Sequence, residues 1–134
     1  MRYLKGCFLL LLLLLLGPLY QAYFGGEVVG AQGDWQSASR DSTGLAPLPA
    51  DYPGAVIQIY AARTYSWRGH FAVHTWVATK AAGADSYLVH QVIGFRKRQG
   101  LKVMRSLPDV PDRYWYGNTP EALVDIRGAD AEQL

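Results

Sequence analysis

The sequence predicts an α+β protein: an N-terminal transmembrane helix, then a small antiparallel sheet of three to four strands with a C-terminal helix. Three observations lead to this fold class. An uncharged run begins at Cys7, segments of alternating polarity follow Ala55, and a helix-start signal occurs at Thr119. The expected parts are a signal anchor over 1–24, an extended stalk or linker over 25–54, and an α+β domain over 55–134.

The N-terminal run "CFLLLLLLLLGPLYQAYF" covers 7–24 and carries no charge. Its length is just enough to cross a hydrocarbon core about 30 Å thick. Arg2 and Lys5 precede it, and a basic start before an apolar run is shared by signal peptides and signal anchors. Tyr20 and Tyr23 supply aromatic rings for the far interface, which favours an uncleaved anchor.

Three other interpretations of this run fit less well. A signal-peptide cleavage site at Val29-Gly30-Ala31 lies about 15 residues beyond the leucine run, farther than an ordinary processing region. A lipoprotein is excluded because Cys7 precedes the apolar stretch instead of following it. A buried core helix of a soluble protein is disfavoured by the basic residues at the N-terminus.

The charges on the two sides of the run predict the orientation. Arg2 and Lys5 lie before it, whereas Glu27 and Asp34 are the first charges after it. The positive-inside rule therefore predicts a single pass through the inner (cytoplasmic) membrane, with the C-terminal domain in the periplasm or extracytoplasmic space. The lipid bilayer is then a partner through 7–24. The net charge of +2 is too small to indicate nucleic acid as a partner.

After the run, residues 25–53 are dominated by Gly, Ser, Ala, Asp and Pro without a sustained period, which indicates a stalk or wrapping segment. The next four segments predict an antiparallel meander. "AVIQIYAA" is typical of a strand buried on both faces, and "FAVHTWVATK" alternates so that His74 and Trp76 share one face. "SYLVHQVIGF" forms a third strand, and "RKRQG" turns into a fourth, "LKVMR".

The C-terminal segment carries a helix-start signal. Thr119 is a capping residue, Pro120 suits the first helical position and Glu121 the first turn, so a helix is expected that Gly128 ends or interrupts. The remaining "ADAEQL" is typical of a second helical start. About 80 residues with this content make a marginal core, which predicts an incomplete domain.

His74 is the first candidate for chemistry. An imidazole near the end of a sheet is suited to act as a general base or proton shuttle, and the alternative is a structural histidine with satisfied hydrogen bonds. His70 and His74 lie four positions apart on an extended chain, about 13 Å at ~3.3 Å per residue, too far to bind one metal ion. No metal site and no cofactor are expected.

Arginines and aromatic residues suggest ligand binding in two segments. Arginine beside tryptophan can hold a carboxylate or phosphate, or simply stack on the ring. "PDRYWYGNTP" is either a loop packed over the sheet or the wall of a cleft. "RKR" at 96–98 is typical of a solvated hairpin tip. The candidate ligand-binding residues are Arg63, Trp67, Arg68, Trp76, Arg113 and Tyr114.

The stretches "VIQIYAARTYSWRGHFAVHTWVATK", "VIGFR" and "PDRYWYGNTPEALVDIRGADAEQL" closely resemble the bacterial family of domains of unknown function DUF3750. The resemblance runs from about Asp34 to the C-terminus, with the N-terminal hydrophobic segment that such proteins carry. It implies a continuation beyond this chain with an Asn-Ser-Asn-Thr-Phe-like motif. That order is similar to circularly permuted papain-like hydrolases of the NlpC/P60 type, and it implies that His74 is a base activating a nucleophile, serine in this family.

Two functions remain as expectations. The first, which we expect for this chain, is a non-catalytic or truncated binding module that is tethered to the membrane and takes an envelope ligand or protein partner. The second is part of a papain-like hydrolase of amide or ester bonds with His74 as general base. Neither involves nucleic acid.

Overall fold

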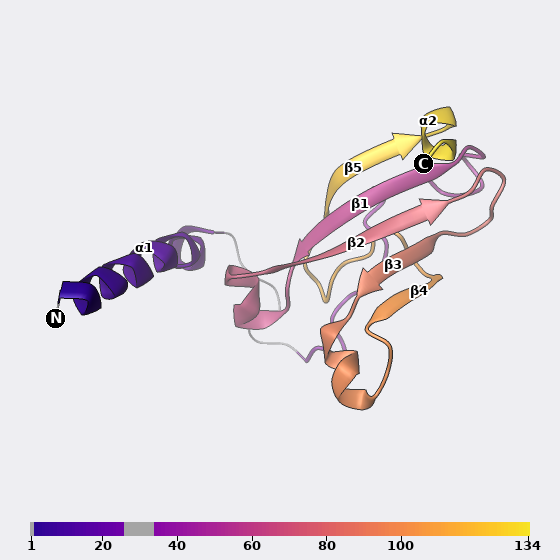
Figure 1. The fold of residues 1–134 in the computed structure, drawn as a ribbon. Helices are drawn as coiled ribbons and strands as arrows, with labels where there is room; N and C mark the ends of the chain where they lie inside the picture. Colours follow the sequence, from indigo (N-terminus) through magenta and orange to yellow (C-terminus); the bar gives the residue numbers. More distant parts are fainter. Residues whose placement is uncertain (1, 26–33) are drawn as a thin grey trace.

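The computed structural model describes residues 2–25 and 34–134. Helix α1 (Arg2–Phe24) extends from one side of a domain built on one sheet (Figure 1). The strands and the short helices follow in chain order: β1 (Val56–Arg63), the 3-10 helix η1 (Ser66–His70), β2 (Val73–Lys80), β3 (Leu88–Val92), the 3-10 helix η2 (Gly94–Gln99), β4 (Met104–Pro108), β5 (Glu121–Arg127) and α2 (Ala129–Glu132).

Helix α1 is long and apolar enough to cross a membrane. Its residues Tyr3–Phe24 have a mean hydropathy of 2.0, and this window is not buried against the domain. Pro18 lies inside the helix, and proline is tolerated in membrane helices because neighbouring groups satisfy the freed carbonyl. Glu27 and the alternative cleavage site at 29–31 lie outside the described residues.

The sheet has five strands in the order β4-β3-β2-β1-β5, and every neighbouring pair is antiparallel. Its first four strands confirm the predicted meander, and the predicted α+β class is confirmed. The register pairs Ala62 with His74 and Tyr60 with Trp76. The predicted faces of the second strand are therefore correct, because residues paired across an antiparallel ladder share a face. The basic tip at 96–98 belongs to η2, and β4 begins at Met104.

The helix predicted to begin at Thr119 is wrong, because this segment is the edge strand β5. It pairs with β1, for example Val124 with Ile59. The capping signal is a local preference of modest energy, whereas strand pairing satisfies the backbone groups of β1 that an open edge would leave unpaired. Gly128, with φ 67° and ψ −138°, ends the strand, and α2 begins directly after it. The second helical start at "ADAEQL" is confirmed by α2.

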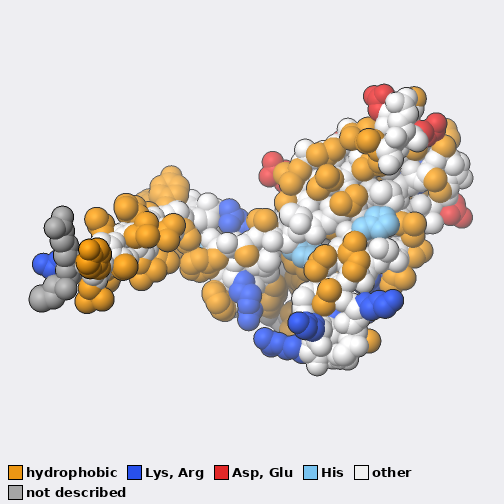
Figure 2. Space-filling model, viewed as in Figure 1, with side chains coloured by type: hydrophobic (Ala, Val, Ile, Leu, Met, Phe, Trp, Pro, Cys, Tyr) orange, Lys and Arg blue, Asp and Glu red, His pale blue; other side chains and the backbone are white. Residues whose placement is uncertain are grey.

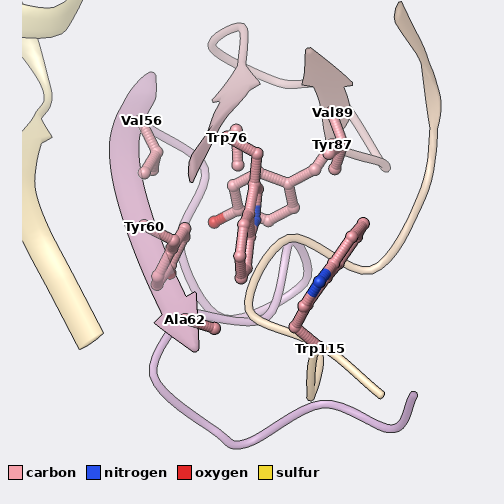
Figure 3. Close-up of a cluster of buried hydrophobic side chains, with 8 residues drawn as sticks. Val56, Tyr60, Ala62, Trp76, Tyr87, Val89 and Trp115 are labelled. Atoms are coloured by element: carbon pink, nitrogen blue, oxygen red, sulfur yellow. The ribbon is translucent and has the colours of Figure 1, made fainter. Parts of the chain in front are cut away.

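One face of the sheet holds the core, and the other does not. Alternate residues of β1, starting at Val56, are buried, while those between them are only partly buried, so the predicted burial on both faces holds for one face only. Figure 3 shows a row of three rings on the buried face. Tyr60 stacks on Trp76 with centroids 5.5 Å apart, and Trp76 stacks on Trp115 at 6.0 Å. Such contacts add to the free energy of burial.

Residues 34–54, the described part of the expected stalk, pack over this core face. The hydroxyl of Tyr87 donates a hydrogen bond to the carbonyl of Pro47 at 2.9 Å, and Ser42 forms an isolated bridge with Arg113. Ala46 and Tyr52 pack against the buried cluster. The wrapping interpretation therefore describes 34–54 better than a free stalk. On the opposite face, apolar side chains such as Val92 remain 59 % exposed.

Candidate functional site

His74 lies on the buried face of β2, where its ring stacks on Trp115 and also lies near Trp76. Its ring stacks almost parallel on Trp115, with centroids 3.6 Å apart and an interplanar angle of 12°. Trp76, two residues along the strand, lies 5.8 Å from it at 26°. His74 itself is partly exposed, whereas both tryptophans are buried. The imidazole is therefore held in a fixed plane with one part still reachable from solvent.

Gln91 on β3 orients the imidazole. Its Oε1 lies 3.0 Å from His74 Nε2, and the side chain is buried, with 3 % exposed. With the Gln91 amide oriented this way, its oxygen accepts a hydrogen bond from Nε2 of His74, and that nitrogen then carries the proton. In the neutral ring, the lone pair then lies on Nδ1. In this arrangement one ring nitrogen is held by the amide, and the other is left without the proton.

The surroundings keep the imidazole neutral. Burial lowers the pKa of His74 below its ordinary 6.5, and the positive charge of Arg113 lowers the pKa further. The hydrogen bond to Gln91 opposes this by favouring the protonated ring. Because the net direction is downward, the surroundings favour the neutral form of the His74 ring.

Arg113 lies near this ring and shares a carboxylate with Arg105. Arg113 and Arg105 both bind the carboxylate of Asp109, at 3.1 Å and 3.2 Å. The guanidinium of Arg113 also lies 5.8 Å from the ring centre of Trp115. Two cations share one carboxylate, which leaves an excess of positive charge near His74. Burial lowers the pKa of Arg113.

The loop that carries Trp115 is tied down by a buried carboxylate. Asp112 is 1 % exposed, and it accepts hydrogen bonds from the hydroxyl of Ser42 at 2.8 Å and from the amides of Leu45 and Ala46 at 2.6 and 3.1 Å. One residue earlier in the loop, the carbonyl of Pro111 accepts a hydrogen bond from the indole N–H of Trp76 at 2.6 Å. The wrapping segment thus positions the loop that carries Trp115.

The predicted site residues fall into two groups. His74, Trp76 and Arg113 are brought together with Trp115, which belongs to the segment predicted as a loop or as the wall of a cleft. Arg63 pairs with Val73 in the register, which places it on the opposite face of the sheet from His74.

The remaining predicted residues lie away from the ring pair. Arg63 donates a hydrogen bond to the carbonyl of Gly69 at 2.8 Å and so holds η1. Trp67 and Arg68 lie exposed on η1, with the guanidinium 5.1 Å from the indole centre. Tyr114 is partly buried, and its amide donates to Asp41 at 2.9 Å. The structure therefore does not bring Arg63, Trp67 and His74 to one cleft.

A family model described as "Protein of unknown function (DUF3750)" matches residues 54–134. This protein belongs to the DUF3750 family. The matched region covers all five strands and the His74 site. No curated protein and no solved structure matches the chain.

In this DUF3750 domain, sequence reasoning missed Gln91 as a partner of His74. A glutamine on the apolar face of a strand was the available signal, because a buried amide needs a hydrogen-bond partner.

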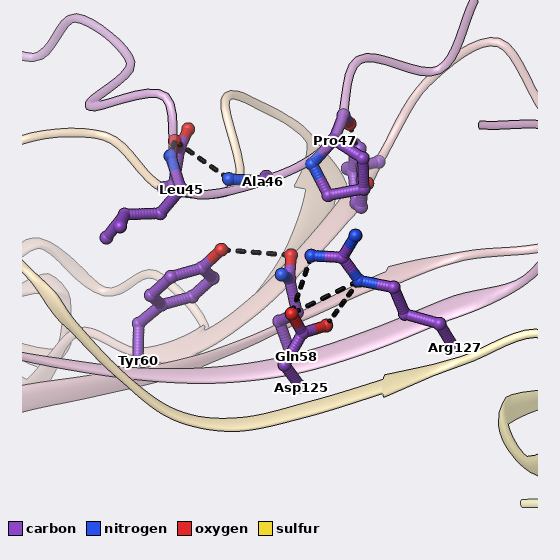
Figure 4. Close-up of polar contacts among 9 residues, drawn as sticks. Leu45, Ala46, Pro47, Gln58, Tyr60, Asp125 and Arg127 are labelled. Carbon is purple, nitrogen blue, oxygen red and sulfur yellow. Dashed lines mark hydrogen bonds and ion pairs between the residues drawn. The ribbon is translucent and has the colours of Figure 1, made fainter. Parts of the chain in front are cut away.

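A second such glutamine occurs at the far end of the same face. Gln58 is fully buried and accepts from the hydroxyl of Tyr60 at 2.9 Å, beside the Asp125–Arg127 ion pair (Figure 4). Burial raises the pKa of Tyr60, so its phenol keeps its proton.

Within the described residues of the DUF3750 chain, no three His, Cys, Asp or Glu side chains gather closely enough to hold a metal ion.

The lowered pKa of His74 predicts a pH-dependent stability. The unfolded chain binds a proton at this ring near pH 6.5 and the folded chain only at lower pH. Its contribution to the free energy of unfolding is thus present above pH 6.5 and is lost as the pH falls through the folded pKa. Urea denaturation at several pH values should show a steeper acid loss for the wild type than for His74→Gln. Equal slopes for the two would contradict the lowered pKa.

Proposed function

We propose that this DUF3750 protein is a membrane-anchored envelope domain whose site uses His74 as a general base toward an amide or ester bond. The observation that carries the proposal is the hydrogen bond from His74 Nε2 to the buried Gln91, which leaves the lone pair on Nδ1. A neutral, oriented imidazole is the group that removes a proton from a hydroxyl or thiol as it attacks a carbonyl. The resemblance to NlpC/P60-type hydrolases supports the same role.

The anchor and its sidedness are part of this proposal. Helix α1 has the length of a span; its uncharged part is preceded by Arg2 and Lys5, and the first charges after it in the sequence are acidic. We infer an uncleaved signal anchor in the inner membrane, with the domain outside the cytoplasm. The domain then acts on material close to the membrane surface.

A second candidate is a binding module without catalysis. The positive charge of Arg113 beside Trp115, with Arg105 on the same carboxylate, favours it. A planar or anionic ligand group fits such a surface, because guanidinium and indole bind carboxylates and flat rings. In this case His74 orients the ligand by stacking and transfers no proton.

Diethyl pyrocarbonate distinguishes the base from a structural histidine, because it acylates unprotonated imidazole nitrogen that solvent reaches. Full-length protein in detergent at neutral pH should be acylated at His74 faster than at His90, whose two nitrogens bond Thr79 and Ser106 at 3.0 Å each. The Gln91→Leu variant should react several-fold more slowly at His74, because its tautomer is no longer fixed. Peptide mass spectrometry gives the rate for each histidine.

A His74 that stays unmodified while His90 reacts would contradict the proposed base. Equal rates for wild type and Gln91→Leu would show that the glutamine does not tune the ring, and would leave the stacking role of the binding module.

A further inference from the structure

The two 3-10 helices η1 and η2 extend from the same end of the sheet. Strands β2 and β3 pair from Trp76 and Gln91 up to Thr79 and Leu88. The start of β2 and the end of β3 therefore lie together, and η1 precedes the one while η2 follows the other. Figure 1 shows the η1 segment beside the C-terminal end of α1 and the η2 segment, in orange, at the lower edge of the domain.

This end of the domain exposes large apolar side chains. Trp67 is 61 % exposed and lies edge-on to Phe71, which is 56 % exposed. In the η2 segment, Phe95 is 56 % exposed and Leu101 is 46 % exposed. Aromatic side chains of this kind are favoured at the headgroup level of a bilayer.

The same two segments are uniformly basic. Neither 63–72 nor 94–102 contains an aspartate or a glutamate. On the face shown in Figure 2, basic side chains lie toward α1 and along η2, while acidic side chains lie toward β5, α2 and the far end. The small net charge of +2 is therefore unevenly placed. The basic residues of these segments are Arg63, Arg68, Arg96, Lys97, Arg98 and Lys102.

The C-terminal part of α1 reaches this end of the domain. A groove there is lined by Gly17, Pro18 and Gln21 of α1 together with His70 and Phe71. Contacts between α1 and η1 agree with this placement. If α1 spans a bilayer, its last turns lie at the interface, and η1 lies at the same level.

We propose that η1 and η2 form a membrane-docking surface, whose aromatic side chains enter the headgroup region and whose basic side chains bind anionic phospholipid. The occupant is the bilayer that α1 spans, so this inference rests on the anchoring proposed above. Charge complementarity and continuity with the anchor favour lipid over a protein partner. Docking fixes the sheet, and with it the His74 site, at a set height above the membrane.

The test is hydrogen exchange of the full chain in nanodiscs holding one copy each. One set contains neutral phosphatidylcholine, and the other contains about a third phosphatidylglycerol, enough to give a negative surface potential. Peptides covering 66–72 and 94–102 should exchange several-fold more slowly in the anionic discs. This protection should fade at high salt, because the headgroup attraction is screened.

Two variants with the same net charge make the result specific. Lys97→Gln with Arg98→Gln removes two charges at the proposed surface, and Ala82→Glu with Ala129→Glu lowers the net charge equally at the far end. The first pair should lose the protection and the second should keep it. Equal exchange in neutral and anionic discs, or protection that needs two copies per disc, would overturn the docking surface.

The same experiment also tests whether α1 anchors the chain in the membrane. Slow exchange in the peptide 8–24 and an intact mass that includes α1 show that the chain is anchored, whatever the two basic segments do. Rapid exchange throughout 8–24, or loss of α1 from the mass, would overturn the anchor and the docking surface together.

Discussion

Replacing Asp112 with alanine should lower the free energy of unfolding by about 3–5 kcal/mol. The carboxylate is 1 % exposed and accepts three short hydrogen bonds from the wrapping segment. Alanine leaves the Ser42 hydroxyl and the amides of Leu45 and Ala46 without their acceptor. Urea denaturation of the full chain in detergent, followed by tryptophan fluorescence, measures the loss.

Asp125→Ala is the matched control, because its carboxylate pairs with Arg127 on the exposed edge strand. An exposed pair of this kind is worth about 1 kcal/mol or less. If Asp112→Ala were no more destabilising than Asp125→Ala, the buried carboxylate would not be what holds residues 42–46 over the core.

The Trp115→Ala variant should also lose about 3–5 kcal/mol, as expected for removing a large buried ring. Trp115 stacks on His74 at 3.6 Å and is 8 % exposed. Its removal admits water to the imidazole, so the pKa of His74 should rise toward its ordinary 6.5. Urea denaturation gives the first effect, and NMR titration of the ring gives the second.

Trp35→Ala serves as the comparison. Trp35 is 53 % exposed, and its ring centroid lies 6.5 Å from that of Tyr116. It should cost about 1 kcal/mol or less and leave His74 unchanged. Similar losses for the two tryptophan variants would show that Trp115 is not part of the core that supports the site.

The sequence predicted the elements whose pattern is local and repeated. Alternation in 73–80 placed His74 and Trp76 on one face, and the uncharged run predicted α1. The segment Glu121–Arg127 was assigned wrongly because its cap and first-turn residues are helix signals. What decides its structure is the open edge of β1, which lies more than 50 residues earlier in the chain and cannot be read from a local pattern.

The site was predictable in part for the same reason. The alternation of side chains along the second strand identified the face on which His74 lies, but its partners come from elsewhere in the chain. Gln91 reaches it through the register of β2 and β3, and Trp115 through a loop held by a buried carboxylate. The register also places Arg63 on the opposite face, although it lies close in sequence. Register and loop placement are tertiary facts that composition and spacing do not contain.

NMR of the full chain with 15N-labelled histidine in detergent tests the central claim most directly, since the chain contains three histidines and variants assign them. The ring nitrogen shifts report both the tautomer and the pKa of His74. We expect a proton on Nε2, a lone pair on Nδ1, and a pKa below 6.5 that rises when Trp115 is removed. A proton on Nδ1, or a pKa at or above 6.5, would contradict it.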